Sequence, residues 1–101
     1  QGRTPLQIAA GMGQTEVVEA LLKLFALPDT IDQEGNTPLM AAVKGKHLGA
    51  VMKLLDWAPD LGVKNLEGKT SLDLATELKQ EAMIQLFKKA QNAGLKEPLI
   101  G

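Results

Sequence analysis

The fold of this chain is decided by one short stretch, Gly35-Asn36-Thr37-Pro38-Leu39-Met40-Ala41-Ala42. Its first three residues follow the pattern Gly-x-Thr, and the same pattern recurs at Gly2 and at Gly68, 33 residues away on either side. This period runs through the 101 residues without an insertion or a deletion. An internal period of about 20–50 residues is typical of a stacked repeat array. We therefore expect three copies of one structural unit, packed side by side.

Each copy carries two apolar stripes with helical spacing. The first stripe follows Thr37-Pro38, where a hydroxyl N-cap precedes a proline at the first helical position; Thr4-Pro5 repeats this arrangement and Thr70-Ser71 keeps only the cap. The pattern predicts helices at about 5–12, 15–25, 38–45, 48–57, 71–78 and 81–91. The coinciding core positions are Leu6, Leu39 and Leu72; Ala9, Ala42 and Ala75; Val18, Val51 and Ile84; and Leu21, Leu54 and Phe87.

The segments between repeats, 28–36 and 59–68, contain the residues that end helices and make turns. Pro28 and Pro59 stop the preceding helix because proline lacks the N–H that a helix needs. Gly35 and Gly68 supply a turn conformation with positive φ that other residues resist. Each segment is predicted to be an extended finger with a tight turn.

The stretch 35–42 resembles the Gly-x-Thr-Pro-Leu-His-x-Ala signature of ankyrin repeats, and residues 2–10 resemble it as well. The resemblance covers essentially the whole chain. It implies an all-α fold, an ankyrin-repeat solenoid of helix-turn-helix units with connecting finger-like β-turns. We expect one domain at 1–101, with repeats at about 1–34, 35–67 and 68–92 and a C-terminal tail at 93–101.

The chain departs from the family pattern at two places. The motif histidine is replaced by Gln7, Met40 and Asp73, so its usual hydrogen bonds must be made otherwise or lost. The glycine that the family places after the second helix is replaced by Phe25 and Ala58. A residue with a side chain there either adopts a strained left-handed conformation or ends the helix differently.

The two end repeats differ in polarity. Lys88 stands where the two earlier copies have leucine, which is typical of a terminal repeat with a polar outer face. Ile8, Ala10 and Val17 give the first repeat no comparable polar face. We therefore expect the chain to be the C-terminal part of a longer array or a larger polypeptide.

Composition narrows the class of protein. The net charge of −1 gives no broad electrostatic reason to bind nucleic acid, and no apolar run is long enough for membrane insertion. The chain has no cysteine, which excludes disulfides and thiolate metal sites. We expect an intracellular protein, cytoplasmic or nuclear, because that is the default for the family.

Motifs for catalysis or cofactors are weak. Gly68-Lys69-Thr70 resembles the end of a phosphate-binding loop, but the required earlier glycine is replaced by Val63, and the triplet is explained as the third Gly-x-Thr copy. His47 is the only histidine and leaves no partner for a triad or a multi-histidine site. Asp73 and Glu77 are one helical turn apart, but two carboxylates rarely hold a cation. We expect no catalytic, cofactor-binding or metal-binding residue.

The resemblance implies that a partner binds the concave side formed by the fingers and the first helices. Successive copies differ there, as a tailored surface on a constant scaffold should. The predicted contact residues are Arg3, Met12, Gln33, Glu34, Asn36, Lys44, Leu66, Glu67, Lys69, Glu77 and Leu78, with Gly11 and Gly45 nearby. Trp57 suits a binding hot spot, but its alignment with Leu24 favours packing in the core.

Three classes of function follow. The first is a non-catalytic protein–protein interaction module that binds another protein or a peptide through the concave surface. The second is a regulatory or structural segment of a larger enzyme or channel that contacts its own chain. An enzyme in its own right is the third, and it is disfavoured because no nucleophile–base pair is present.

Overall fold

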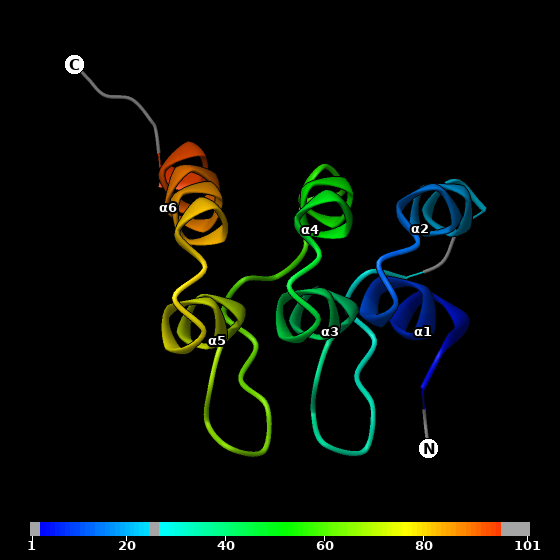
Figure 1. Cartoon of the computed structure of the whole chain (residues 1–101), viewed down its shortest axis with the longest axis horizontal. Helices are drawn as coiled ribbons and strands as arrows, with labels where there is room; N and C mark the ends of the chain where they lie inside the picture. The colour runs from blue at the N-terminus through cyan, green and yellow to red at the C-terminus, as the bar shows by residue number, and fades with distance from the viewer. Residues whose placement is uncertain (1–2, 25–26, 96–101) are drawn as a thin grey trace.

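The computed structural model describes residues 3–24 and 27–95, without the side chains of 93–95. These residues form six helices and no strand: α1 (Pro5–Gly11), α2 (Thr15–Lys23), α3 (Pro38–Lys44), α4 (Leu48–Leu55), α5 (Ser71–Glu77) and α6 (Glu81–Leu95). Figure 1 shows two layers, with the first helices α1, α3 and α5 in one row and the second helices in the other. The loops that enter α3 and α5 project away from both layers. The all-α architecture predicted from the sequence is confirmed.

Each first helix begins at the threonine that the sequence indicates. The side-chain oxygens of Thr4, Thr37 and Thr70 accept hydrogen bonds from the third helical N–H, at 3.1–3.2 Å. In this way each threonine satisfies one of the N–H groups that a helix start leaves without a partner. The three first helices therefore begin at equivalent positions of the repeat.

The first helices end in the same left-handed turn. Gly13 has a φ of 73°, and the lysines at the equivalent positions, Lys46 and Lys79, have φ of 62° and 56°. In each turn, the N–H of this residue and that of the next bond back to carbonyls of the preceding helix. The two lysines therefore adopt a conformation that is strained for residues with a side chain. The repeat pattern of the sequence gives no sign of this strain at the two lysines.

The second helices end at positions where the sequence departs from the family pattern, because the family glycine is replaced there. Ala58 has a φ of 51°, so at this position the replaced family glycine is accommodated by a left-handed residue. Phe25, the equivalent residue of the first repeat, lies outside the described residues. The predicted end of the last helix at 91 is wrong, because α6 continues to Leu95. Its last turns consist largely of good helix formers, and the sequence reaches a proline only at Pro98.

The core lies between the two helix layers and runs through all three repeats. Its fully buried members include most predicted positions: Leu6, Leu39, Ala9, Ala42, Ala75, Val18, Val51, Leu54 and Phe87. Leu72, Ile84 and Leu21 are half-buried, because they lie at the two ends of the array. Trp57 is 44% exposed, so its predicted role in the core is wrong. It lies two residues after the last residue of α4, beyond the apolar stripe of that helix.

Candidate functional site: the concave groove

The two fingers are shaped by one acidic or amide side chain each. Oδ1 of Asp32 accepts hydrogen bonds from the N–H groups of Glu34 and Asn36, at 2.9 and 3.0 Å. Oδ1 of Asn65 accepts equivalent bonds from Glu67 and Lys69, at 2.9 and 3.1 Å. The predicted positive φ of the finger glycines is confirmed, at 79° for both. Both fingers therefore have the same turn and present the following residues in the same orientation.

The fingers are also bonded to each other. The N–H of Leu66 donates to the carbonyl of Glu34 at 2.9 Å, and Nδ2 of Asn65 donates to Oδ1 of Asn36 at 3.0 Å. Gly35 lies so close to the second finger that a Cβ at this position would come within 3.0 Å of the backbone nitrogen of Leu66. The fingers therefore form a connected rim along one side of the array.

Gln7, which stands at the position of the motif histidine, makes two hydrogen bonds with its side chain. Its Oε1 accepts from the N–H of Thr4 at 3.2 Å, and its Nε2 donates to the carbonyl of Asn36 on the next finger. Met40, at the equivalent place, is fully buried and apolar. Asp73 caps α5 by accepting from the N–H of Thr70 at 3.0 Å. The replaced position therefore has a different role in each repeat.

Two adjoining hollows run between the fingers and the first helices. The first has a volume of about 400 Å³ and is lined by Arg3, Gln7, Ile8, Gly11, Met12, Asp32, Glu34, Asn36, Ala41, Lys44 and Gly45. The second has a volume of about 320 Å³ and is lined by Glu34, Asn36, Lys44, Asn65, Leu66 and Glu67. They share Glu34, Asn36 and Lys44, so we treat them as one surface, the concave groove. Its concave position suits an extended segment of a partner.

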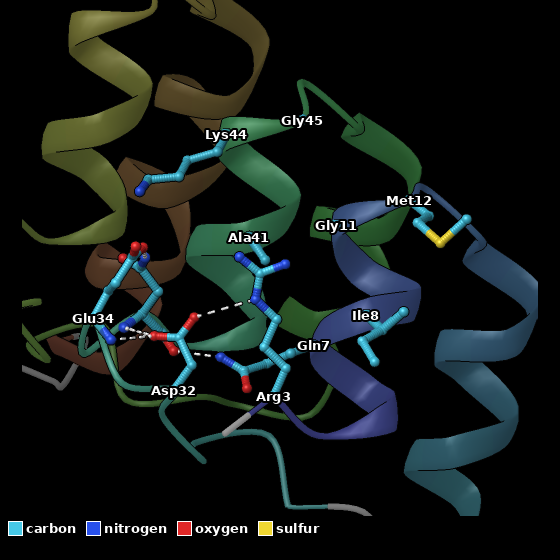
Figure 2. Close-up of a pocket in the computed structure, with 11 residues that line it drawn as sticks. Arg3, Gln7, Ile8, Gly11, Met12, Asp32, Glu34, Ala41, Lys44 and Gly45 are labelled. Carbon is cyan, nitrogen blue, oxygen red and sulfur yellow. Dashed lines mark hydrogen bonds and ion pairs between the residues drawn. The ribbon is translucent and has the colours of Figure 1, made fainter. Parts of the chain in front are cut away.

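The groove has a charged middle and apolar ends. Figure 2 shows Arg3, Asp32 and Glu34 on one side of α1, with Lys44 extending from α3. Ile8 and Met12 extend from the other side of α1, and Met12 is 62% exposed. At the far end, Leu66 is 79% exposed at the tip of the second finger. Exposed apolar side chains bordered by charges are typical of a protein interface.

The charges of the groove differ in how far they are paired. Nε of Arg3 lies 3.8 Å from Oδ2 of Asp32, whose side chain is only 7% exposed. Beyond the groove, Nζ of Lys69 lies 2.6 Å from Oε2 of Glu77. The hydrogen bond to Glu77 raises the pKa of Lys69 above its usual value. Among the described residues, Lys44 and Glu67 take part in no ion pair within 4.0 Å.

The groove brings together seven of the predicted contact residues: Arg3, Met12, Glu34, Asn36, Lys44, Leu66 and Glu67. Gln33, Lys69, Glu77 and Leu78 do not line it. Gln33 is exposed on its finger, whereas Leu78 is half-buried against the core. Asn36 is only 5% exposed, because its side chain bonds the second finger. Its main role in the structure is to hold the rim rather than to offer a free side chain.

Five lining residues were absent from the prediction: Gln7, Ile8, Asp32, Ala41 and Asn65. A signal for Asp32 and Asn65 was present in the sequence, because an Asx residue three positions before each finger glycine favours this turn. Ile8 is 48% exposed, although its place in the apolar stripe of the first helix suggested a buried residue. The sequence pattern alone gives no sign of that.

The structure also shows where the other sequence motifs lie and whether the described residues could hold a metal ion or cross a membrane. Within it, no cluster of three or more His, Cys, Asp or Glu residues is placed to hold a metal ion. The helices there are too short or too polar to cross a membrane. The triplet Gly68-Lys69-Thr70 leads into the cap of α5, as the third copy of the repeat motif should. The ring of His47 packs beside Gly13 and Gly45, where an added Cβ would come within 2.5 Å of it.

Comparison with known proteins identifies the repeat family of the chain. A family model described as ankyrin repeats (3 copies) matches residues 1–65 and 23–97. Rabankyrin-5 of Homo sapiens is 32% identical over 98 residues, which are 95% of this chain and 8% of that protein. Palmitoyltransferase ZDHHC13 of Homo sapiens is 35% identical over 89 residues, which are 86% of this chain and 14% of that protein.

A third relative also matches most of this chain and is much longer than it. Oxysterol-binding protein-related protein 1 of Rattus norvegicus is 44% identical over 75 residues, which are 70% of this chain and 8% of that protein. The chain thus spans a small part, 8–14%, of the length of these three relatives.

Proposed function

The chain belongs to the ankyrin repeat family, and from this premise we propose that it is a non-catalytic module that binds another protein or a peptide along the concave groove. Ankyrin repeats are in general protein-interaction modules, and the family is in general non-catalytic. The single observation that carries the proposal is the continuity of the groove. Two hollows on successive repeats share Glu34, Asn36 and Lys44, which gives a surface long enough for an extended segment.

The chemistry of the groove defines what a partner must offer. Lys44 favours an acidic group in the middle of the partner segment, whereas Glu34 and Glu67 favour basic groups on either side. Met12 and Leu66 are 62% and 79% exposed. They favour apolar side chains on the partner, because contact with such side chains removes apolar surface from water. Since the rim is held by hydrogen bonds between the fingers, little ordering is required when a partner binds.

A second candidate function is supported by the comparisons. Each relative named above is much longer than this chain, and one of them is a palmitoyltransferase. The same groove then binds a segment of the polypeptide that contains it. In the first candidate function the bound segment belongs to another protein or peptide, and in the second it belongs to the same polypeptide as the groove.

A crosslinking pull-down with paired variants tests the proposal. The groove variant is Met12→Asp with Leu66→Asp, which introduces charge at two exposed places along the groove. The matched control is Met52→Asp with Leu48→Asp, because these residues are 49% and 37% exposed on α4, away from the groove linings. Circular dichroism first establishes that both variants remain folded.

The expected result is a partner captured by the wild type and by the control but lost with the groove variant. Capture that is retained by the groove variant and lost by the control contradicts the proposal, because it assigns binding to α4. If none of the three proteins captures a separate partner, the second candidate function is favoured. Binding to a segment of the parent polypeptide then provides the direct assay.

A further inference from the structure

The only tryptophan of the chain lies outside both the core and the concave groove. Trp57 is 44% exposed and follows α4, the second helix of the middle repeat. This helix packs against α2 on one side and against α6 on the other. The exposure of Trp57 is therefore a property of the middle repeat, between two neighbours that the structure describes. Leu24, at the equivalent place after α2, is 72% exposed, so this position is not a core position in the first repeat either.

The segments that come after α2 and α4 lie side by side. The N–H of Asp60 donates a hydrogen bond to Oδ1 of Asp29 at 2.9 Å. Oδ1 of Asp60 in turn accepts from the N–H of Gly62 at 2.9 Å. Both carboxylates thus use one oxygen to fix the backbone around them. The two segments are held together before any partner binds, which lowers the ordering cost of binding.

Three exposed aspartates border Trp57 on these segments. The stretches 27–31 and 56–63 contain all three and have no lysine or arginine. They are Asp29, Asp56 and Asp60. In the part of the chain that the structure describes, none of the three takes part in an ion pair within 4.0 Å. The lysines of the preceding helices, Lys23 and Lys53, lie 3.6 and 3.5 Å from Oε2 of Glu19.

We call the surface formed by Trp57, Asp29, Asp56 and Asp60 the tryptophan edge. We propose that the tryptophan edge binds a basic segment of a partner protein, with a lysine or arginine placed beside the aspartates and against the indole. Tryptophan is enriched among the residues that dominate binding energy. A cationic side chain over the face of an indole is attracted by the ring, and here also by the carboxylates.

The same charges disfavour other occupants of this edge. Anionic lipid surfaces and the phosphates of nucleic acids both require lysine or arginine on the protein, and three aspartates repel them. A symmetric contact between the tryptophan edges of two copies of this chain would place aspartates against aspartates. Charge complementarity thus favours a basic segment of a different protein.

The emission of Trp57 reports on this edge alone, because the chain has no other tryptophan. The probe is a short synthetic peptide of lysine, arginine and leucine, and the control peptide has glutamate in place of each basic residue. We expect the basic peptide to shift the emission to shorter wavelength and to reduce quenching by acrylamide, because the indole loses contact with water. The acidic peptide should do neither.

Two double variants separate the edge from the groove. Asp56→Asn with Asp60→Asn removes two charges and keeps the acceptor for the N–H of Gly62. It should weaken binding of the basic peptide about 2- to 30-fold, the effect of losing two exposed charge pairs. The matched control, Glu34→Gln with Glu67→Gln, removes the same charge from the concave groove. It should leave the affinity measured through Trp57 unchanged.

Four results would overturn the proposal. The first is an emission spectrum that the basic peptide leaves unchanged. The second is an equal loss of affinity in the two double variants, since binding would then follow the net charge of the chain alone. The third is an emission shift caused by phosphatidylserine vesicles and not by the basic peptide, which would make a lipid surface the occupant. The fourth is a dimer, seen by sedimentation, that Trp57→Ala dissociates, which would make a second copy the occupant.

Discussion

Nδ2 of Asn65 donates a hydrogen bond to Oδ1 of Asn36, 3.0 Å away and 29 residues earlier in the chain. The same spacing relates Arg3 to Asp32, which form an ion pair at 3.8 Å. The x residue of each of these two Gly-x-Thr motifs is thus joined to the Asx residue of the following finger. The carboxylate Asp32 pairs with the cation Arg3, whereas the amide Asn65 bonds the amide Asn36.

The first prediction concerns this amide. Asn65→Asp keeps the acceptor for the N–H groups of Glu67 and Lys69 but removes the donor to Asn36. Both positions are at most 6% exposed, so the loss of a buried hydrogen bond should cost about 1–3 kcal/mol of unfolding free energy. Urea denaturation of the two proteins measures the difference.

The reciprocal substitution at the other finger is the control. Asp32→Asn also keeps its two backbone acceptor bonds and loses only the ion pair with Arg3, whose side chain is 59% exposed. It should cost less than about 1 kcal/mol. Equal losses for the two substitutions would show that the Asn36–Asn65 bond has no special weight.

The second prediction concerns the left-handed lysine after α3. Lys46 has a φ of 62°, which costs a residue with a side chain about 1–2 kcal/mol. Glycine removes this strain but loses about 0.5–1 kcal/mol through the greater freedom of the unfolded chain. Lys46→Gly should therefore raise the midpoint of thermal unfolding slightly, and a clear decrease would argue against the strain.

The opposite substitution at the equivalent glycine should be harmful. Gly13→Ala places a Cβ at a φ of 73° and within 2.5 Å of Nδ1 of His47. Combining it with His47→Ala relieves the steric overlap and leaves the backbone strain. The double variant should therefore recover part of the lost thermal stability relative to Gly13→Ala alone.

The third prediction compares two equivalent leucines. Leu39 is 1% exposed in the middle repeat, so Leu39→Ala should cost about 2–5 kcal/mol. Leu72, at the same place in the third repeat, is half-buried, so Leu72→Ala should lower the free energy of unfolding clearly less. Urea denaturation checks both. If the two losses were equal, cover by the following repeat would have no part in the stability of this position.

The fourth prediction concerns pH and the pair formed by Lys69 and Glu77. The folded pKa of Lys69 is raised above its ordinary value of 10.5, chiefly by the hydrogen bond to Glu77. Folding then favours the protonated form, so the small stabilisation by the pair is fully present below pH 10.5 and is lost as the pH rises through the folded pKa. The urea midpoints of wild type and Lys69→Gln should differ at pH 8, begin to converge above pH 10.5 and coincide once the pH exceeds the folded pKa. A gap that stays constant would contradict the prediction.

The sequence predicted the elements whose cause is local. The threonine caps and the finger glycines depend on a few neighbouring residues, and they appear where the period places them. Trp57 was misassigned because alignment shows that it shares a position with Leu24, which is itself 72% exposed. Equivalence in a repeat predicts a common environment without saying whether that environment is the core.

The residues that line the concave groove could be predicted only in part, because the environment of a position depends on neighbouring repeats. The x residue of Gly-x-Thr varies between copies, which suggested a free contact residue at Asn36. Its burial depends on Asn65, a residue in the next repeat, and such pairing between repeats is not a property of either residue alone.

The central claim is that a partner binds along the concave groove, and backbone amide chemical shifts measured during titration with the captured partner test it most directly. The largest changes should fall at the lining residues Ile8, Gly11, Met12, Glu34, Leu66 and Glu67. Changes confined to the exposed sides of α2, α4 and α6, with the groove amides unmoved, would contradict it.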